Sequence, residues 1–235
     1  MNQAFGRTAV IIGASSGIGE ALTRELNRGG WRLGLLARRL DRLEALRQSL
    51  APGTLVRHLD VTQDAAATIL QQVLNDLGDV DLVIISAGTG HNNQGLRRDL
   101  DAETVTVNVL GFMTMAQVAL RHFLAQGHGH LVGISSVAAL RGNAAAAAYA
   151  ASKAFQSVYL DGLRELARKS GHPIVVTEVQ PGGVDRPCCS RIARCPHSRD
   201  DCSSRRLQER PRRFFVPFSA RRSTPTSRSG MRSSR

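Results

Sequence analysis

Residues 8–19 read Thr-Ala-Val-Ile-Ile-Gly-Ala-Ser-Ser-Gly-Ile-Gly, and this stretch decides the fold of the chain. Its first five residues are mostly β-branched and apolar, which predicts a short buried strand. Gly13, Gly17 and Gly19 follow, and a helical pattern begins among them. Glycines at a strand-to-helix turn let the backbone approach a pyrophosphate, which the helix N-terminus attracts. Because the spacing differs from the common dinucleotide fingerprint, and such glycines are often purely structural, the rest of the chain has to decide.

Apolar runs and helical patterns alternate up to Val179. The apolar runs predict strands at 8–12, 32–37, 54–59, 81–85, 130–135 and 174–179. The helical patterns lie between them, at 18–28, 40–50, 64–77, 101–126 and 149–169. Strands that alternate with helices are typical of a parallel sheet covered on both faces. We therefore expect an α/β fold with a doubly wound parallel sheet, a Rossmann-like three-layer α/β/α domain.

The second predicted strand ends in Ala37-Arg38-Arg39. An acidic residue at this place would bind the ribose hydroxyls of NAD, whereas a guanidinium pairs with the 2′-phosphate of NADP. The alternative is a solvated, basic helix start. We expect NADP rather than NAD, held by Arg38 and Arg39. The phosphate loop would contribute Gly13, Ser15, Ser16, Gly17, Ile18 and Gly19.

A tyrosine and a lysine form the candidate reactive pair. Tyr149-Ala-Ala-Ser-Lys153 lies at the start of the last predicted helix, with Ser136 thirteen residues before the tyrosine. Residues four apart share one face of a helix, so the lysine ammonium would favour the phenolate form of the tyrosine. Ser136 follows a predicted strand and could hold a substrate oxygen beside the phenol. This grouping suits proton transfer in carbonyl and alcohol chemistry.

Together these segments resemble the short-chain dehydrogenase/reductase family over residues 8–185. The resemblance rests on motifs in order and at the expected spacing: Gly13–Gly19, Asp60-Val61, Ser86-Ala87-Gly88, Asn108, Ser136, Tyr149 with Lys153, and Pro181-Gly182. It implies an NADP-dependent oxidoreductase that interconverts a carbonyl and a secondary alcohol of a small molecule by hydride transfer.

The resemblance also implies a role for each matching residue. Tyr149 would be the general acid for ketone reduction and the base for alcohol oxidation, with Lys153 supporting it and binding the nicotinamide ribose. Ser136 would orient and polarise the substrate carbonyl, and Asn108 would hold a water that relays protons to Lys153. The other cofactor contacts implied are Asp60 at the adenine, Val61, Ala87, Gly88, and Pro181 with Gly182 at the nicotinamide.

Each of these residues also has a plain structural interpretation. Asn108 or Asp60 could be a helix cap, and Ser136 could be a turn residue at a strand end; only the combination favours the catalytic interpretation. The family's Asn-Asn-Ala-Gly motif appears here as Ile85-Ser86-Ala87-Gly88, and Ser86 keeps a hydrogen-bonding group but lacks the amide. The part of that residue in bracing the central sheet is therefore open.

The composition divides the chain in two. Residues 1–185 hold 17 Lys/Arg against 16 Asp/Glu, whereas residues 186–235 hold 14 Arg against 3 acids, which accounts for most of the net charge of +12. All four cysteines lie beyond residue 185, so a disulfide framework is excluded before it. We expect an oxidoreductase domain over 1–185, incomplete at its C-terminal end, and a basic tail over 186–235, disordered or non-native.

Three interpretations compete for the tail. Its arginines could bind nucleic acid or an acidic membrane surface. A zinc site at Cys189, Cys195, His197 and Cys202 lacks the short cysteine spacing of such sites. The third and favoured interpretation is an out-of-frame translation of a GC-rich gene after the Asp185 codon, because arginine-rich, lysine-free sequence with sudden cysteines is what a shifted frame yields.

Patterns that the sequence lacks predict the cellular location of the protein, its metal content and its oligomeric state. The N-terminus has no signal-peptide pattern and no uninterrupted apolar run approaches the roughly 18 residues that span a bilayer, so we expect a cytoplasmic protein without membrane or nucleic-acid partners. The histidines show no metal-ligand spacing, and no metal is expected. Intact relatives commonly form homo-oligomers through long helices and a last strand, and that strand is not readable here.

Overall fold

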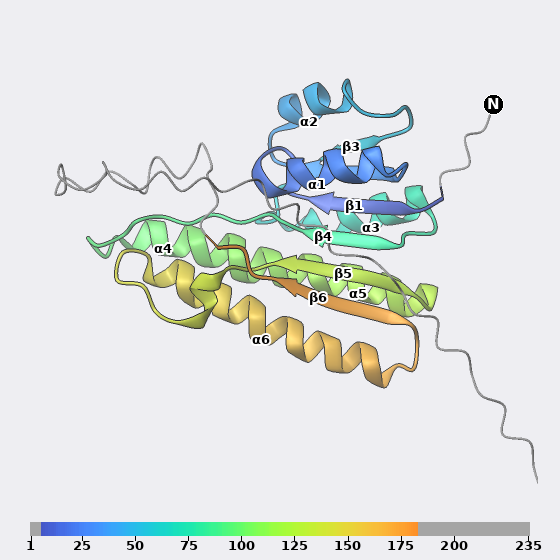
Figure 1. Ribbon diagram of the computed structural model, residues 1–235. Helices are drawn as coiled ribbons and strands as arrows, with labels where there is room; N and C mark the ends of the chain where they lie inside the picture. Colours follow the sequence, from blue (N-terminus) through green and yellow to red (C-terminus); the bar gives the residue numbers. More distant parts are fainter. Residues whose placement is uncertain (1–5, 183–235) are drawn as a thin grey trace, which may run out of the picture. The chain divides into compact units, whose positions relative to one another are not determined.

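A computed structural model describes residues 6–182 of the chain. The described part forms one six-stranded parallel sheet, with strand order β3-β2-β1-β4-β5-β6 (Figure 1). The strands are β1 (Thr8–Ile12), β2 (Arg32–Ala37), β3 (Leu55–His58), β4 (Leu82–Ile85), β5 (Gly129–Ile134) and β6 (Ile174–Val179). Each expected strand is present, with ends that differ by at most one residue. The predicted doubly wound, Rossmann-like fold is confirmed.

Helices connect consecutive strands. They are α1 (Gly17–Arg28), α2 (Leu40–Arg47), α3 (Ala66–Leu77), α4 (Arg98–Val105), α5 (Phe112–Gln126) and α6 (Ala147–Lys169). A π-helical turn, η1 (Thr106–Gly111), joins α4 to α5, and a short 3-10 turn, η2 (Val137–Leu140), follows β5. The helix expected over 101–126 therefore begins earlier and contains a change of helical period.

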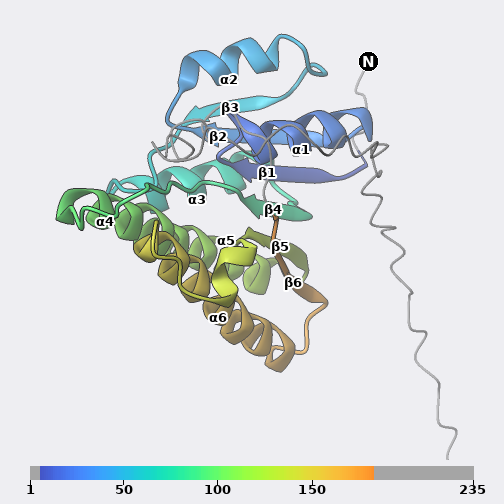
Figure 2. The same ribbon diagram turned by 60° about the vertical axis from the view of Figure 1, so that its left-hand side comes forward.

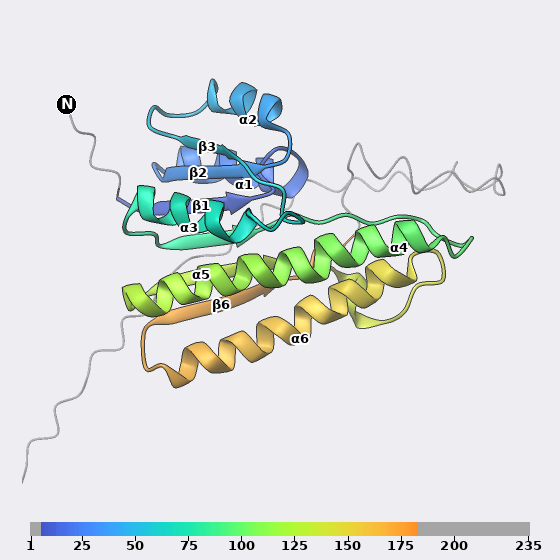
Figure 3. The same cartoon turned by 180° about the vertical axis from the view of Figure 1, so that it is seen from behind.

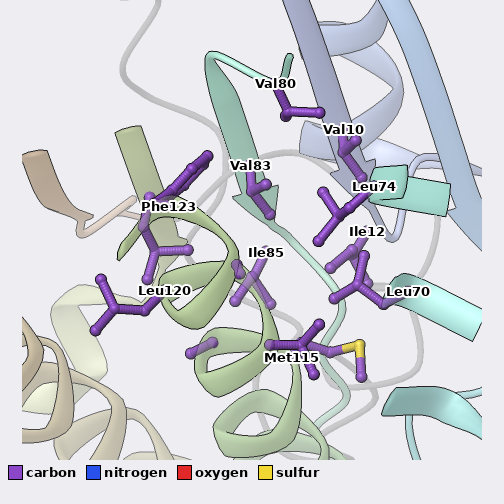
Figure 4. Close-up of a cluster of buried hydrophobic side chains, with 14 of the residues drawn as sticks. Val10, Ile12, Leu70, Leu74, Val80, Val83, Ile85, Met115, Leu120 and Phe123 are labelled. Carbon is purple, nitrogen blue, oxygen red and sulfur yellow. The ribbon is translucent and has the colours of Figure 1, made fainter. Parts of the chain in front are cut away.

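Alternating strand residues build a core on each face of the sheet. Val10 and Ile12 of β1 pack with α3, α5 and α6, whereas Ala9 and Ile11 pack with α1 and α2. Figures 1 and 2 show these helices as two layers with the sheet between them. In the larger core, side chains of β1, β4, α3 and α5 converge around Ile85 and Met115 (Figure 4). Such alternation follows from the two-residue period of a strand.

The helix over Arg98–Gln126 corrects one expectation. Among the residues that the structure describes, it is the one helix long and apolar enough to cross a membrane by length and composition. Several of its apolar side chains, including Phe112, Met115 and Phe123, are instead buried in the core that includes the sheet and α3. Figure 3 shows α5 lying alongside α6 over the sheet. It is a core helix of the domain.

The sheet places the candidate site at the carboxyl ends of its strands. β1 pairs with β2 on one side and with β4 on the other. The strands up to β3 therefore extend the sheet in one direction from β1, and the strands from β4 onward extend it in the opposite direction. Ligands of open α/β sheets bind outside the carboxyl ends at this switch point. At the sheet edge, β6 pairs with β5, and its Val175 and Val179 are exposed in the described part of the chain. The expected tail, its cysteines and the domain boundary at 185 lie outside the described residues.

Candidate active site

The glycine turn after β1 packs against the end of β4. A Cβ added at Gly13 would lie 2.6 Å from the backbone nitrogen of Ala87, and one at Gly19 would lie 2.3 Å from the Gly13 carbonyl oxygen. Gly13 and Gly17 also have φ values of 91° and 60°, which favour glycine. The turn therefore brings bare backbone to the N-terminus of α1, the geometry that an anionic group needs to approach.

Arg39 lies across this turn. Its Nη2 donates hydrogen bonds to Ser15 Oγ at 3.1 Å and Ser16 Oγ at 2.6 Å. The neighbouring Arg38 is exposed beside it at the end of β2. The Arg39 guanidinium is thus directed onto the glycine turn, and Arg38 is exposed next to it in the chain.

Asp60 and Val61 have structural contacts of their own. Asp60 Oδ1 accepts hydrogen bonds from the Thr62 backbone amide at 3.0 Å and from Thr62 Oγ1 at 2.8 Å. The carboxylate thereby caps the turn after β3, while α3 begins only at Ala66. Val61 packs against Gly111 of η1, where an added Cβ would lie 2.7 Å from Val61 Cγ2. This segment therefore anchors the loop after β3 to the π turn.

One face of α6 carries the polar residues of the site. Tyr149, Ser152, Lys153 and Gln156 are spaced by three, one and three residues, so they follow the same side of the helix. The Lys153 Nζ lies 5.7 Å from the centroid of the Tyr149 ring. A Cβ on Gly90 would lie 2.5 Å from that ring, so the loop after β4 closes on the other side of the tyrosine.

Asn108 lies in the π turn and is fully buried. Its side-chain amide pairs with the Thr89 backbone, with 2.7 Å from Nδ2 to the carbonyl oxygen and 2.9 Å from the Thr89 nitrogen to Oδ1. The Nδ2 also donates to Ser152 Oγ at 2.9 Å, and this hydroxyl donates to the Tyr149 carbonyl at 2.8 Å. Asn108 therefore ties the loop after β4 to α6; it is not a helix cap.

The Lys153 side chain is buried where the loop after β4 meets α6, and 5% of the residue's surface is exposed. Its Nζ donates to the Ile134 carbonyl at 3.0 Å and to Gln156 Oε1 at 2.9 Å. A Cβ on Gly88 would lie 3.5 Å from the same nitrogen. The ammonium is thus held between the end of β5, α6 and the loop after β4.

Ser136 begins η2, the turn that packs against α6. Its Oγ accepts a hydrogen bond from the Ala138 amide at 3.1 Å, and the Val137 amide donates to the Pro181 carbonyl at 3.1 Å. The end of β5 therefore holds both Ser136 and the Pro181-Gly182 segment. The turn contact agrees with the plain structural interpretation of this serine.

A carboxylate braces the adjacent strand end. Burial raises the pKa of Glu178, but hydrogen bonds from Ser157 Oγ at 2.6 Å and Gln180 Nε2 at 3.0 Å outweigh burial and hold this pKa below its ordinary value. The charged carboxylate links β6 to α6 and fixes the segment that leads to Pro181. Among the described residues, no group of three or more His, Cys, Asp or Glu residues could hold a metal ion.

Sequence reasoning missed Ser152, Gln156 and Thr89. Ser152 and Gln156 carry a usable signal, because they continue the polar face that Tyr149 and Lys153 begin on an otherwise mixed helix. Thr89 carries none, since its contribution is backbone.

Comparisons with known proteins now decide the family. A family model described as short chain dehydrogenase matches residues 7–194. The chain belongs to the short-chain dehydrogenase/reductase family. An uncharacterized oxidoreductase from Myxococcus xanthus is 39% identical over 184 residues, which cover 76% of this chain and 72% of that protein. The expected enzyme class, an NAD(P)-dependent oxidoreductase of this family, is confirmed.

Solved structures of several reductases and dehydrogenases share the fold. The crystal structure of an actinorhodin polyketide ketoreductase variant with NADPH is 28% identical, with a TM-score of 0.71 over 79% of this chain and 74% of the other. An alcohol dehydrogenase from the archaeon Thermococcus sibiricus, complexed with 5-hydroxy-NADP, is 30% identical, with a TM-score of 0.67 over 77% of each chain. A 3-ketoacyl-(acyl-carrier-protein) reductase from Brucella melitensis, complexed with NADH, is 24% identical, with a TM-score of 0.70 over 75% of each, and shows the fold alone.

Proposed function

We propose that this short-chain dehydrogenase uses NADP(H) to interconvert a ketone and a secondary alcohol, with Tyr149 as the general acid and base. The observation that carries the proposal is the position of the Lys153 ammonium. It is buried 5.7 Å from the Tyr149 ring centroid, at the carboxyl end of β5. A buried cation next to a phenol favours proton transfer from that phenol.

The residues around the glycine turn fit a dinucleotide with a 2′-phosphate. There is no room for a Cβ at Gly13 or Gly19, so the turn consists of bare backbone at these positions. This backbone would bind a pyrophosphate together with Ser15, Ser16, Gly17 and Ile18. Arg38 and Arg39 supply the positive charge that a 2′-phosphate requires at the end of β2. Two relatives at 28% and 30% identity were solved with NADPH or an NADP derivative. Asp60, Val61, Ala87, Gly88, Pro181 and Gly182 would complete the cofactor site.

The chain's own residues would manage the proton and the substrate oxygen. The nicotinamide, when bound, supplies or takes up the hydride. Ser136 would donate a hydrogen bond to the substrate carbonyl, and Tyr149 would transfer its proton to the same oxygen. Lys153 would stabilise the resulting phenolate, and Asn108 would keep the loop after β4 against α6. In alcohol oxidation the phenolate would remove the hydroxyl proton instead.

The test combines binding with turnover. Fluorescence titration of the full chain with NADPH and NADH measures cofactor affinity, and a panel of ketones of different size and polarity measures reduction. We expect NADPH to bind more tightly than NADH and at least one ketone to be reduced. Tighter binding of NADH would contradict the NADP assignment, and reduction that survives Tyr149→Phe would contradict the role of the tyrosine.

A second candidate is a cofactor-binding protein without turnover. On β6, at one edge of the sheet that the structure describes, Val175 and Val179 are exposed. We retain the proposal that the segment after Asp185 is an out-of-frame product that replaces the substrate-binding part. NADPH binding with no reduction of any ketone would favour this candidate. An uninterrupted reading frame at codon 185 in independent isolates would contradict it.

A cytoplasmic location, a small-molecule substrate and the absence of nucleic-acid binding belong to the same proposal. Loss of salt-sensitive DNA binding on deleting residues 186–235 would instead support the basic-tail interpretation.

A further inference from the structure

The side-chain amide of Gln156 joins Lys153 to Asn108. Gln156 is fully buried on α6, one turn after Lys153. Its Oε1 accepts a hydrogen bond from Lys153 Nζ at 2.9 Å, and its Nε2 donates to the Asn108 carbonyl oxygen at 2.8 Å. One side chain therefore connects the reactive helix to the π turn through two short hydrogen bonds.

Chemistry fixes the orientation of this amide. A lysine ammonium has only donors, so the group that faces Lys153 must be the amide oxygen. A backbone carbonyl has only lone pairs, so the group that faces Asn108 must be the NH₂. The reversed amide would oppose two donors on one side and two acceptors on the other, which makes the observed arrangement the one that satisfies both ends.

The π turn explains how the Asn108 carbonyl becomes a partner. In a regular α-helix the Phe112 amide would donate to this carbonyl, four residues back. Here the Phe112 amide donates to the carbonyls of Val107 and Val109. The change of period in η1 therefore directs the Asn108 carbonyl toward α6, where Gln156 meets it. Such π turns often occur at functional sites.

We propose that Gln156 is a positioning residue that fixes the Lys153 ammonium for proton transfer at Tyr149. Together with the Ile134 carbonyl it fixes two of the three N–H directions of the ammonium, and these two determine the third. The inference rests on the proposed function of Tyr149 and Lys153 and deepens it.

The same contact bears on the expected role of Asn108. The family resemblance implies that Asn108 holds a water that relays protons to Lys153, and in this chain the Gln156 amide hydrogen-bonds to both the Lys153 Nζ and the Asn108 carbonyl oxygen. An amide donates and accepts hydrogen bonds, but unlike water it does not readily give up a proton at neutral pH. The link through Gln156 therefore holds the lysine in place and does not conduct protons away from it.

The test uses the fact that the chain has only two lysines, Lys153 and Lys169. With ¹⁵N-labelled lysine, NMR measures how fast each ammonium exchanges protons with water, without cofactor or substrate. Lys169 is exposed beside Glu165 and serves as the internal reference. We expect the Lys153 ammonium to exchange more slowly than that of Lys169. Replacing Gln156 by Met, which keeps the volume and removes both hydrogen bonds, should accelerate Lys153 exchange roughly tenfold.

Two further variants separate positioning from folding. Gln156→Glu keeps an oxygen toward Lys153 and should restore most of the slow exchange. Gln126→Met is the matched control, because Gln126 pairs with the Val80 backbone at 2.9 and 3.1 Å near the opposite end of β4. It should lower stability in urea unfolding and leave Lys153 exchange unchanged. Equal Lys153 exchange in the native chain and Gln156→Met would overturn the proposal.

Turnover gives the second readout. In Gln156→Met we expect kcat for ketone reduction to fall about ten- to a hundredfold, with KM within about threefold of the native value, since the lysine is misplaced and substrate contacts are kept. An unchanged kcat would overturn the proposal. If the native chain reduces no ketone, the proposed function fails, and the exchange of Lys153 still decides whether Gln156 positions the ammonium.

Discussion

Both ends of the parallel sheet contain half-buried or buried amides and charges, but these make different kinds of contact. At the amino end, Gln126 pairs with the Val80 backbone, and Asp81 Oδ2 accepts a hydrogen bond from the Thr8 amide at 2.7 Å. At the carboxyl end, Asn108, Lys153 and Gln156 hydrogen-bond to one another's side chains and backbone in a continuous network. The amino-end groups hydrogen-bond to the backbone beside the starts of the strands, whereas the carboxyl-end groups hold a cation beside a phenol.

This difference predicts which property a substitution at each end of the sheet should change. Substitutions at the amino end should change the free energy of unfolding and leave the chemistry intact. Substitutions of the polar side chains at the carboxyl end should change turnover or cofactor affinity, with smaller effects on stability. Each of the following experiments pairs a site variant with a control chosen elsewhere in the same fold.

The largest effect is expected for Tyr149→Phe. Loss of the phenolic hydroxyl removes the proton donor, and general acid catalysis contributes about 10²–10⁴-fold, so kcat for ketone reduction should fall about 10³-fold. Steady-state kinetics with NADPH and an accepted ketone measures this change. The other tyrosine of the chain, Tyr159, stacks on Phe155 at 5.4 Å between centroids, and Tyr159→Phe should keep turnover. Equal losses in both variants would contradict the assignment.

The next effect separates close approach from backbone strain. Gly13 and Gly30 both have positive φ values, 91° and 75°, but an added Cβ meets the Ala87 backbone only at Gly13, with nothing within 4 Å at Gly30. Gly13→Ala should therefore cost at least about 2 kcal/mol more stability than Gly30→Ala. Urea unfolding followed by tryptophan fluorescence measures both. Similar costs would mean that the glycine turn is looser than its contacts indicate.

A smaller effect is expected at Arg39. Its guanidinium is directed onto Ser15 and Ser16, where a 2′-phosphate would replace these hydroxyl partners. A charge-assisted hydrogen bond contributes about 1.5–3 kcal/mol, so Arg39→Ala should weaken NADPH binding roughly ten- to a hundredfold and leave NADH affinity nearly unchanged. The exposed Arg42 on α2 offers the control Arg42→Ala. Parallel losses for NADPH and NADH would contradict 2′-phosphate recognition.

The smallest effect is a pH dependence at the amino end. Burial lowers the pKa of His130, whose Nε2 lies 2.8 Å from Thr177 Oγ1. As pH falls through the unfolded value of about 6.5, the unfolded chain takes up a proton that the folded chain refuses, so stability decreases. His130→Gln should reduce this loss between pH 7 and pH 5.5 in urea unfolding. His122 is half-buried, its pKa is lowered by the same cause, and it is present in both proteins. An identical pH dependence in both would sink this explanation.

Much of the fold could be predicted because its signals are local. The apolar runs at 8–12 and 32–37 gave strand bounds that the structure repeats, and Tyr149 with Lys153 follows from helical spacing alone. The π turn at 106–111 could not be predicted, since its apolar residues continue the period of the flanking helices. The helix predicted over 101–126 has its counterpart in α4, η1 and α5, and composition alone does not distinguish such a core helix from a membrane span.

The missed part of the site depends on contacts distant in sequence. Gln156 reaches the Asn108 carbonyl across 48 residues, and Ser152 reaches its side chain across 44. Neither partner is identifiable until the sheet brings β4 and β5 together.

The family match over 7–194 extends nine residues past Asp185, so the unmatched part of the tail begins at Cys195.

The most direct test of the account follows a label from cofactor to product. NADPH deuterated at the transferred position is incubated with the full chain and each ketone, and mass spectrometry measures deuterium in the alcohol. We predict one deuterium per alcohol formed with the native chain, and about 10³-fold slower transfer with Tyr149→Phe. Bound NADPH that keeps its deuterium with every ketone, or transfer that Tyr149→Phe leaves unchanged, would contradict the claim that the carboxyl-end network performs carbonyl chemistry.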